Sequence, residues 1–453
     1  MQTVKIFPDQ VVGTVKPMHA VNNGPVSGRK TQKRSNFETF KEARIPYSRN
    51  HDASFCPTYG GENIVDVHAI FKNFDADPYD PASYDFTLTD LFLENILAAG
   101  TKIYYRLGSK IEHCIKKYGT LVPKDFQKWA VICEHIIKHY NEGWADGFHW
   151  NIEYWEIWNE PEGHPDGSNC MWLGTQEEYF ALYRTAATHL KNCFGDKIKI
   201  GGFAATGFSA LKYENSQRAL QTGNTEGLTD REAIVLHRQT YYLAFLEMLK
   251  EHRPPIDFFS WHSYEPFDFN FIQQAYAEET LAEAGYSDIE IHLNEWNTHH
   301  SVKEMGTAGA AASSAAMMCA MQETKMTMMN FYDARITTSD YCGLFDSRFR
   351  CPMATYDAFL AFGTLYALGA QAEVKGLGED LYATAATNGK DNAILLANIG
   401  EEREVSLNFC GKYFAYAITD DTRMKPASID PAAFRMAKDT VIFFTTQELT
   451  IPQ

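Results

Sequence analysis

Residues 151–161 read Asn-Ile-Glu-Tyr-Trp-Glu-Ile-Trp-Asn-Glu-Pro, an aromatic-rich run that ends in a carboxylate and a proline. Isoleucine, tyrosine and tryptophan favour a pleated and buried strand. Pro161 has no N–H to donate to a neighbouring strand, so we expect the strand to end there. The run therefore predicts a buried strand with Glu160 at its carboxyl end.

A second strand pattern ends in the same way. Residues 290–297 read Glu-Ile-His-Leu-Asn-Glu-Trp-Asn, so Glu295 also follows an asparagine at the end of a buried run. The two glutamates are 135 positions apart (295 − 160). An ion pair between loops would explain one such carboxylate. Two of them favour one catalytic pair built from distant parts of a barrel, as glycoside hydrolysis requires.

Short apolar runs alternate with longer helical patterns from about residue 14 to residue 368. This alternation is typical of βαβ units and a parallel sheet. Eight strands are expected, at about 14–20, 45–49, 102–107, 151–161, 197–201, 256–262, 290–297 and 326–332. We therefore predict an α/β fold, with a (β/α)8 TIM barrel over residues 14–368.

The pattern changes after Gly369 to short strands separated by turn signals, among them the pair Asn388-Gly389. These features predict a smaller C-terminal β-sandwich domain over residues 369–453. Residues 1–13 precede the first expected barrel strand, so we expect them to add a strand to the sandwich. Residues 50–83 are long and irregular, and loops of that length are usually functional.

Composition excludes some classes of partner. The net charge of −17 argues against nucleic acid, because duplex affinity comes largely from Lys and Arg. No apolar run reaches the ~18 residues of a membrane span. Without a visible signal peptide we expect a cytoplasmic protein, or a secreted or periplasmic one if a leader was removed. The nine cysteines lack a C-x-x-C pair, which predicts buried free thiols.

The run from Trp155 to Pro161 resembles the acid/base motif of the clan of retaining (β/α)8 glycoside hydrolases, and most closely that of family 39, the β-xylosidase and α-L-iduronidase family. The resemblance spans most of the barrel and extends to a C-terminal sandwich. Supporting motifs are Val21-Asn22-Asn23-Gly24-Pro25, Arg49-Asn50-His51, Trp261-His262-Ser263-Tyr264 and Leu293-Asn294-Glu295-Trp296-Asn297.

The resemblance implies a role for each matched residue. Glu160 would be the general acid/base and Glu295 the nucleophile. Asn159 would hydrogen-bond the sugar 2-hydroxyl. Arg49 would keep Glu295 ionised and Tyr264 would donate a hydrogen bond to it. The remaining matched side chains, His51 and His262, would line the pocket.

Aromatic side chains give apolar faces on which sugar rings can stack. Trp296 and Tyr332 are expected to do this, whereas Trp172 is as consistent with core packing as with stacking. Family 39 xylosidases usually have Thr before the nucleophile and Trp at the end of the eighth strand. This chain has Asn294 and Tyr332 there, so the sugar stays open.

We expect a hydrolase without cofactor or metal that acts on a carbohydrate, with β-xylosides first and galactosides, arabinopyranosides or iduronides as alternatives. His299-His300 does not suggest a metal, because adjacent strand residues point to opposite faces. If the two carboxyl groups are ~5 to 5.5 Å apart, the enzyme would retain the anomeric configuration of the sugar. If they are ~6.5 to 9.5 Å apart, it would invert that configuration. A glycan-binding barrel without activity and a metal-dependent hydrolase are the rivals. The oligomeric state is open.

Overall fold

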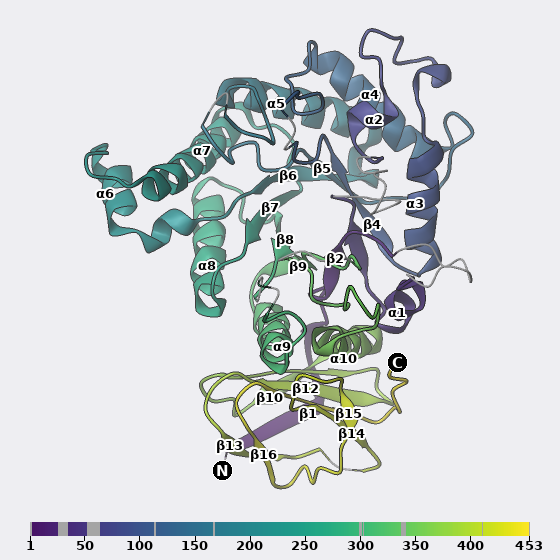
Figure 1. The fold of residues 1–453 in the computed structure, drawn as a ribbon, viewed down its shortest axis with the longest axis vertical. Helices are drawn as coiled ribbons and strands as arrows, with labels where there is room; N and C mark the ends of the chain where they lie inside the picture. Colours follow the sequence, from purple (N-terminus) through teal and green to yellow (C-terminus); the bar gives the residue numbers. More distant parts are fainter. Residues whose placement is uncertain are drawn as a thin grey trace. The chain divides into compact units, whose positions relative to one another are not determined.

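The computed structural model of the 453-residue chain describes residues 2–25, 35–51, 64–112, 115–165, 168–298, 301, 303–336, 341–409 and 411–452 (Figure 1). A barrel closes through eight strands in the order β2-β3-β4-β5-β6-β7-β8-β9. Their bounds are β2 (Ala20–Asn22), β3 (Tyr47–Arg49), β4 (Lys102–Leu107), β5 (Tyr154–Ile157), β6 (Lys199–Ala205), β7 (Phe258–Ser263), β8 (Glu290–Trp296) and β9 (Met326–Phe331). The (β/α)8 architecture is confirmed.

The first barrel strand was predicted wrongly. Residues 14–20 were expected to form it, but a long strand ends at Thr14 and β2 begins only at Ala20. Pro17 lies between the two strands and cannot donate to a neighbouring strand, which explains the break. The fourth strand is also shorter than expected. It stops at Ile157, three residues before Glu160.

Helices connect the barrel strands, and two of them begin with complete capping boxes. Thr175 and Glu178 cap α5, and Thr229 and Glu232 cap α7. No helix within the described ranges combines the length and apolarity that a membrane crossing requires. The helices are α1 (Phe37–Glu42), α2 (Val67–Ile70), α3 (Thr87–Ala98), α4 (Phe126–Glu142), α5 (Gln176–Phe194), α6 (Glu214–Thr222), α7 (Asp230–His252), α8 (Phe267–Glu283), α9 (Ala308–Gln322) and α10 (Ala354–Leu368), with 3-10 turns at Pro81–Ser83, Gly195–Lys197 and Ser209–Lys212.

The remaining strands form a second, mixed sheet in the order β15-β14-β17-β12-β11-β10-β1-β13-β16. The N-terminal strand β1 (Gln2–Thr14) runs antiparallel to β10, and its first residues pair in parallel with β13. The other strands are β10 (Ala370–Lys375), β11 (Leu381–Thr387), β12 (Asn392–Asn398), β13 (Arg403–Leu407), β14 (Phe414–Ile418), β15 (Lys425–Pro426), β16 (Phe434–Met436) and β17 (Thr440–Thr445). The expected β-rich C-terminal part is confirmed.

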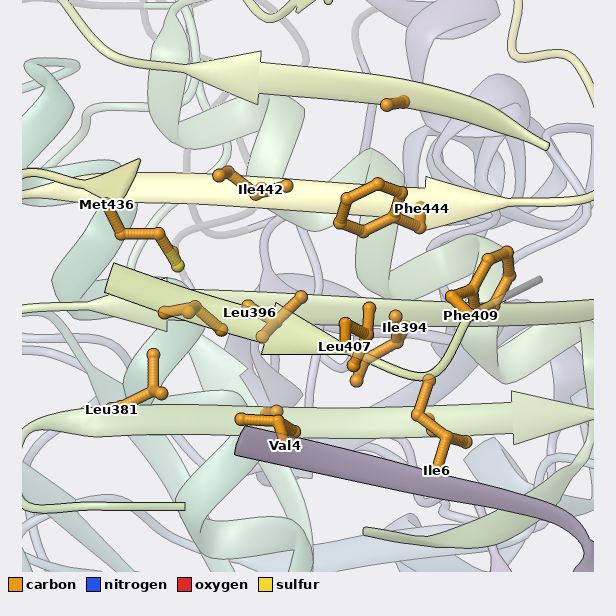
Figure 2. Close-up of a cluster of buried hydrophobic side chains, with 14 of the residues drawn as sticks. Val4, Ile6, Leu381, Ile394, Leu396, Leu407, Phe409, Met436, Ile442 and Phe444 are labelled. Carbon is orange, nitrogen blue, oxygen red and sulfur yellow. The ribbon is translucent and has the colours of Figure 1, made fainter. Parts of the chain in front are cut away.

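Figure 2 shows the core of this second sheet, where side chains from β1, β12 and β17 meet those of β13 and β16. Val4 and Leu396 are fully buried there. Burying such side chains stabilises each by roughly 1.5 to 3 kcal/mol. The N-terminal strand is therefore held by the core at the other end of the chain.

By internal contacts the chain divides into two compact units. One comprises residues 1–48, 95–102 and 295–453, and the other residues 49–94 and 103–294. Within the first unit, α9 and α10 pack against β11 and β12. The domain limits predicted at residues 14 and 369 stay a prediction.

Candidate active site

The chain turns sharply after β5. Trp158 N still donates to Leu107 O at 2.7 Å, as a continued strand would. Trp158 and Glu160, however, have φ angles of 75° and 45°, the left-handed region that side chains rarely adopt. Such residues cost about 1 to 3 kcal/mol each and gather at functional sites. The backbone between Ile157 and Pro161 is therefore bent at the carboxyl end of the strand.

A glycine makes room for this bend. Gly108, just after β4, has φ 131°, and a Cβ built on it would lie 2.9 Å from the Trp158 ring. Any larger residue would displace Trp158, which is 1% exposed. The peptide of Glu160 is fixed on the other side, because its N–H donates to Ala204 O at 3.2 Å. Neighbouring strands thus position the Asn159-Glu160 peptide.

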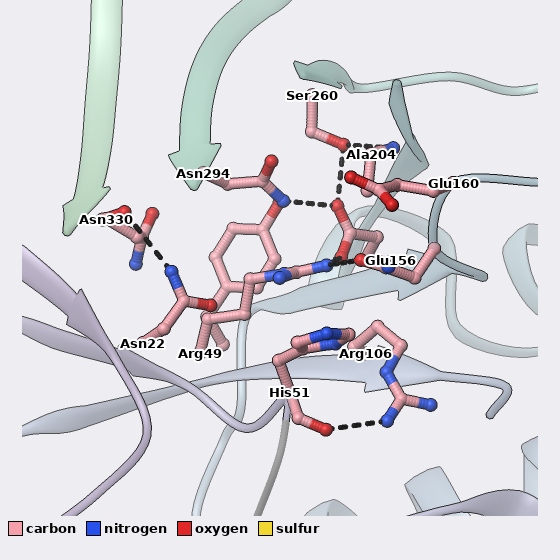
Figure 3. Close-up of polar contacts among 12 residues, drawn as sticks. Asn22, Arg49, His51, Arg106, Glu156, Glu160, Ala204, Ser260, Asn294 and Asn330 are labelled. Carbon is pink, nitrogen blue, oxygen red and sulfur yellow. Dashed lines mark hydrogen bonds and ion pairs between the residues drawn. The ribbon is translucent and has the colours of Figure 1, made fainter. Parts of the chain in front are cut away.

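Glu156, in the middle of β5, is the centre of a buried polar network (Figure 3). Its Oε1 accepts hydrogen bonds from Ser260 Oγ at 2.6 Å and Asn294 Nδ2 at 2.5 Å. Its Oε2 accepts from Arg49 Nε at 2.7 Å. Side chains from β3, β7 and β8 therefore donate hydrogen bonds to one carboxylate, and together they compensate for its removal from water.

Arg49 joins this network to Asn159. Its Nη2 donates to Asn159 Oδ1 at 2.5 Å, and its side chain is fully buried. Because the amide oxygen of Asn159 is engaged by Arg49, the amide N–H₂ is the group that it can offer to a ligand. The expected contact between Arg49 and Glu295 stays a prediction.

Glu160 is paired with His262. His262 Nδ1 lies 2.6 Å from Glu160 Oε1, and the carboxyl group is 25% exposed while the imidazole is 1% exposed. Burial by itself raises the pKa of Glu160 and is the largest effect. The hydrogen bond and charge of His262, with Arg238 and Arg49, outweigh burial and bring the pKa of Glu160 below its ordinary value. The pair can hold one proton between imidazole and carboxyl.

A second carboxyl lies two residues further on. Glu162 is 1% exposed, and its Oε1 accepts from the N–H and hydroxyl of Thr206. Burial raises the pKa of Glu162 to about 7, and the charge of Glu160 acts in the same direction. Glu162 is therefore the buried acid of this loop that titrates near neutral pH.

His51 belongs to a neighbouring buried cluster. Its backbone oxygen accepts from Arg106 Nη2 at 2.9 Å, and the same nitrogen donates to Asp66 Oδ1 at 2.6 Å. Arg106 and Asp66 are both fully buried, which fixes the backbone after β3. Tyr264 directly follows β7. The predicted contacts of His51 and Tyr264 with substrate stay predictions.

Glu295 and Trp296 are the last two residues of β8, and they are 5% and 1% exposed. Side chains alternate along a strand, so the two point to opposite faces. Trp296 packs against Phe331 at 5.3 Å and Phe359 at 6.4 Å between ring centroids. Stacking of a sugar on Trp296 stays a prediction.

Tyr332 follows β9 and is half-buried. Its hydroxyl accepts from Arg335 Nη2 at 3.2 Å, and Arg335 Nε donates to the buried Asp333 at 2.6 Å. Asn23 also donates to Asp333, at 3.2 Å. The loop that carries Tyr332 is thus fixed by one buried carboxylate, and sugar stacking by Tyr332 stays a prediction.

Trp172 is a core residue. It is 1% exposed, its indole N–H donates to Thr175 O at 3.0 Å, and its ring meets Trp158 edge to face. Core packing, one of the two readings of the sequence, is therefore the one that the structure supports. His299 and His300 lie outside the described residues.

Helices α4 and α5 carry a group of side chains of the kinds that bind metals. Ligand atoms of Glu134, His189 and Cys193 lie within 4.8 Å of one another. Glu134 already accepts from Lys138 and from His189 Nε2 at 2.6 Å, so its charge is neutralised without an ion. Three of the described cysteines are buried: Cys133, Cys319 and Cys342.

The sequence predicted no role for Glu156, Ser260 and Asn294 in the buried network, nor for Glu162 in the loop after β5. A signal for Glu156 was present, since a carboxylate amid the apolar residues of a central strand requires buried partners. Asn294 was noted only as a departure from the family, and its donation to Glu156 gives it a function in this chain. For Glu162 the sequence carries no signal, because burial depends on the packing of distant segments.

The closed parallel barrel and the polar side chains that follow its strands place the chain in the class of (β/α)8 barrel proteins with a site at the carboxyl ends of the strands. The model of the family described as Glycosyl hydrolases family 39 matches residues 44–332. The chain therefore belongs to glycosyl hydrolase family 39.

Known proteins agree with this family and this fold. A beta-xylosidase from Caldicellulosiruptor saccharolyticus is 24% identical over 229 residues, 47% of this chain and 37% of the relative. The chain spans less than half the length of the curated relatives it matches. A glucosidase from Croceicoccus marinus has a TM-score of 0.75 at 18% identity, with 98% of each chain covered. A monomeric beta-xylosidase from Caulobacter crescentus CB15 has a TM-score of 0.63 at 14% identity, covering 98% of this chain and 99% of that one.

Proposed function

We propose that the protein is a retaining glycoside hydrolase that cleaves neutral β-linked sugars, with β-xylosides as the first substrate class. The observation that carries this proposal is the Asn159-Glu160 peptide after β5, which is fixed by Arg49, Ala204 and His262 in a family 39 barrel. The curated relatives named as beta-xylosidases support the choice of sugar. No cofactor is required by this chemistry.

In the first step, Glu295 attacks the anomeric carbon as Glu160 gives its proton to the oxygen of the breaking glycosidic bond. The leaving alcohol departs, and the sugar stays bound to Glu295 as an ester. In the second step, Glu160 takes a proton from water, whose oxygen attacks the same carbon and releases the sugar with its original anomeric configuration. Glu160 thus ends protonated, as it began, with a proton that comes from water.

The partners of Glu160 suit both steps. With His262 neutral the proton resides on Glu160, ready for the leaving oxygen. After transfer, the carboxylate keeps the hydrogen bond from His262 Nδ1, which stabilises the ionised form until water arrives. The Asn159 amide is proposed to bind the sugar 2-hydroxyl, a contact that strengthens in the transition state.

Intact-protein mass measurement after incubation with a 2-fluoro xylosyl inactivator tests the proposal. We expect a mass increase of one fluoro sugar on the wild type and none on Glu295→Gln. A panel of fluorinated gluco-, galacto- and arabinopyranosyl reagents would assign the sugar. A wild type that forms no adduct and hydrolyses no aryl glycoside would favour a glycan-binding barrel. Loss of hydrolysis with EDTA would instead favour a metal-dependent hydrolase.

A further inference from the structure

Three side chains of the kinds that bind transition metals converge where α4 packs against α5 (Figure 1). His189 and Cys193 are four positions apart on α5, so they lie on the same face of the helix. Glu134 meets them from the middle of α4. One ligand atom of each side chain lies within 4.8 Å of the other two. The two helices thus bring a carboxylate, an imidazole and a thiol together.

The distances between these atoms suit a tetrahedral zinc site. Zinc binds imidazole nitrogen at about 2.0 to 2.1 Å and thiolate sulfur at about 2.3 Å, so the two atoms lie about 3.6 Å apart around it. His189 Nε2 and Cys193 Sγ are 3.7 Å apart. Glu134 Oε2 is 2.6 Å from the same nitrogen. A zinc ligand would lie about 3.4 Å from it, so the carboxylate oxygen has to move by about 0.8 Å.

Two further side chains hold the possible ligands in place. Gln127 Nε2 lies 2.9 Å from His189 Nδ1, the other ring nitrogen. With a metal on Nε2 the ring proton resides on Nδ1, and the amide oxygen of Gln127 accepts it after a half-turn of the amide. Lys138 donates to Oε1 of Glu134, the oxygen that does not face His189. Metal ligands are commonly oriented by such outer partners.

A simple polar contact between two helices would share most of these features. His189 donates to Glu134, and Lys138 balances the carboxylate charge without an ion. Cys193 adds little to such a contact, because it is exposed and a thiol is a weak hydrogen-bonding group. As a thiolate, however, cysteine is a preferred ligand of zinc. The position of Cys193 therefore favours a metal site over a polar contact.

We propose that Glu134, His189 and Cys193 form a structural site for a thiophilic divalent transition metal, zinc(II) in the first place. On binding, the thiol of Cys193 loses its proton to solvent and its sulfur bonds to the metal. A cavity of about 660 Å³, lined by His189 and by polar side chains such as Thr188 and Asn192, admits water as the fourth ligand. Magnesium and calcium do not suit the site, because they prefer oxygen ligands throughout.

The metal would clamp two helices and take no part in hydrolysis. Helix α5 follows the loop that carries Glu160 and leads to β6, so its last turns lie toward the amino ends of the barrel strands. In (β/α)8 enzymes the carboxyl ends of the strands carry the chemistry, and the opposite end contributes to stability. The inference therefore does not depend on the proposed function, and the expected hydrolysis without a metal is unaffected.

Cobalt(II) alone is the probe, because it occupies tetrahedral zinc sites and absorbs visible light there. We expect the chelator-treated protein to bind one cobalt ion, with visible bands of a tetrahedral site and a thiolate-to-cobalt band in the near ultraviolet. Cys193→Ser should lose the near-ultraviolet band. The matched control Cys351→Ser alters a free cysteine outside the cluster and should keep it. No cobalt complex, or a near-ultraviolet band that persists in Cys193→Ser, would overturn the inference.

Two more variants separate a metal ligand from its outer partner. His189→Gln should abolish the tetrahedral spectrum, because it removes the central ligand. Gln127→Ala should keep both bands and weaken cobalt binding about 10- to 100-fold, as loss of an outer partner does. A His189→Gln spectrum equal to that of the wild type would contradict the site. Unchanged affinity in Gln127→Ala would contradict the arrangement of its ligands.

Thermal unfolding tests the structural role. Zinc at 100 times its Kd should raise the Tm of the wild type by roughly 2 to 5 °C. The Tm of Cys193→Ser should not respond, and its far-ultraviolet circular dichroism and metal-free Tm should match those of the wild type. An equal rise in both proteins would overturn the inference, and so would a loss of kcat/KM with EDTA well below the Tm. A wild type inactive on all glycosides would reject the proposed function alone, since none of the spectra depends on turnover.

Discussion

The guanidinium of Arg49 lies 2.7 Å from the carboxylate of Glu156, and both side chains are completely buried. The pair connects the second and fourth strands of the barrel. Because each charge compensates the other away from water, removing one leaves a buried charge without its counter-ion. The same arginine orients Asn159, so the stability of the barrel and the geometry of the candidate site both depend on Arg49.

Replacing Arg49 with Ala is therefore expected to destabilise the protein by about 3 to 5 kcal/mol, measured by urea denaturation. Lys72→Ala is the control, since its ion pair with Asp85 is 65% and 47% exposed. Exposed pairs contribute about 0 to 1 kcal/mol. Similar small losses for the two variants would contradict the importance of the buried pair.

The two glutamates are expected to differ in their dependence on the leaving group. Glu295→Gln should be nearly inactive on every glycoside, because it removes the proposed nucleophile. Glu160→Gln should lose about 10²- to 10⁴-fold in kcat/KM on alkyl glycosides, and much less on dinitrophenyl glycosides. Steady-state kinetics on both substrates check this. Equal losses for both variants on the activated substrate would reject the assignment of roles.

His262 is expected to affect the pH profile through the pKa of Glu160. It lowers the pKa of Glu160, so His262→Gln should raise that pKa and move the alkaline limb of kcat/KM on an alkyl glycoside to higher pH. The overall rate is also expected to fall, and the position of the limb is the informative quantity. A limb that moves to lower pH would show that His262 does not favour the ionised carboxyl.

Glu162 should also make the stability of the fold depend on pH. Its pKa is about 7 in the folded protein and 4.5 in the unfolded reference, so the folded state binds more protons between these values. Stability from this group is complete below pH 4.5 and is lost as the pH rises through 7. The difference of 2.5 units (7 − 4.5) corresponds to about 3 kcal/mol. Urea denaturation of the wild type and Glu162→Gln from pH 4.5 to 8 measures it, and parallel curves would refute it.

Much of the barrel could be predicted from short-range patterns. Residues 102–107 read as a strand and form one, and Glu295 lies at the end of β8 as expected. The first strand was misplaced. Apolar residues flank Pro17 on both sides, and a local pattern does not show which of the two runs begins the barrel. The packing of Trp296 could not be predicted, because its contacts with Phe331 and Phe359 join segments that are distant in the sequence.

The sequence by itself determined the order of strands and helices and the two glutamates that end buried runs, because periodicity and turn chemistry are local properties. Only the tertiary structure decided that Glu156 is shared by Arg49, Ser260 and Asn294. It also decided that Glu162 is buried with one oxygen for which the described part of the chain offers no partner. Hydrogen bonding and desolvation depend on which distant segments pack together. A carboxyl group therefore acquires its charge state from the folded surroundings rather than from its sequence neighbours.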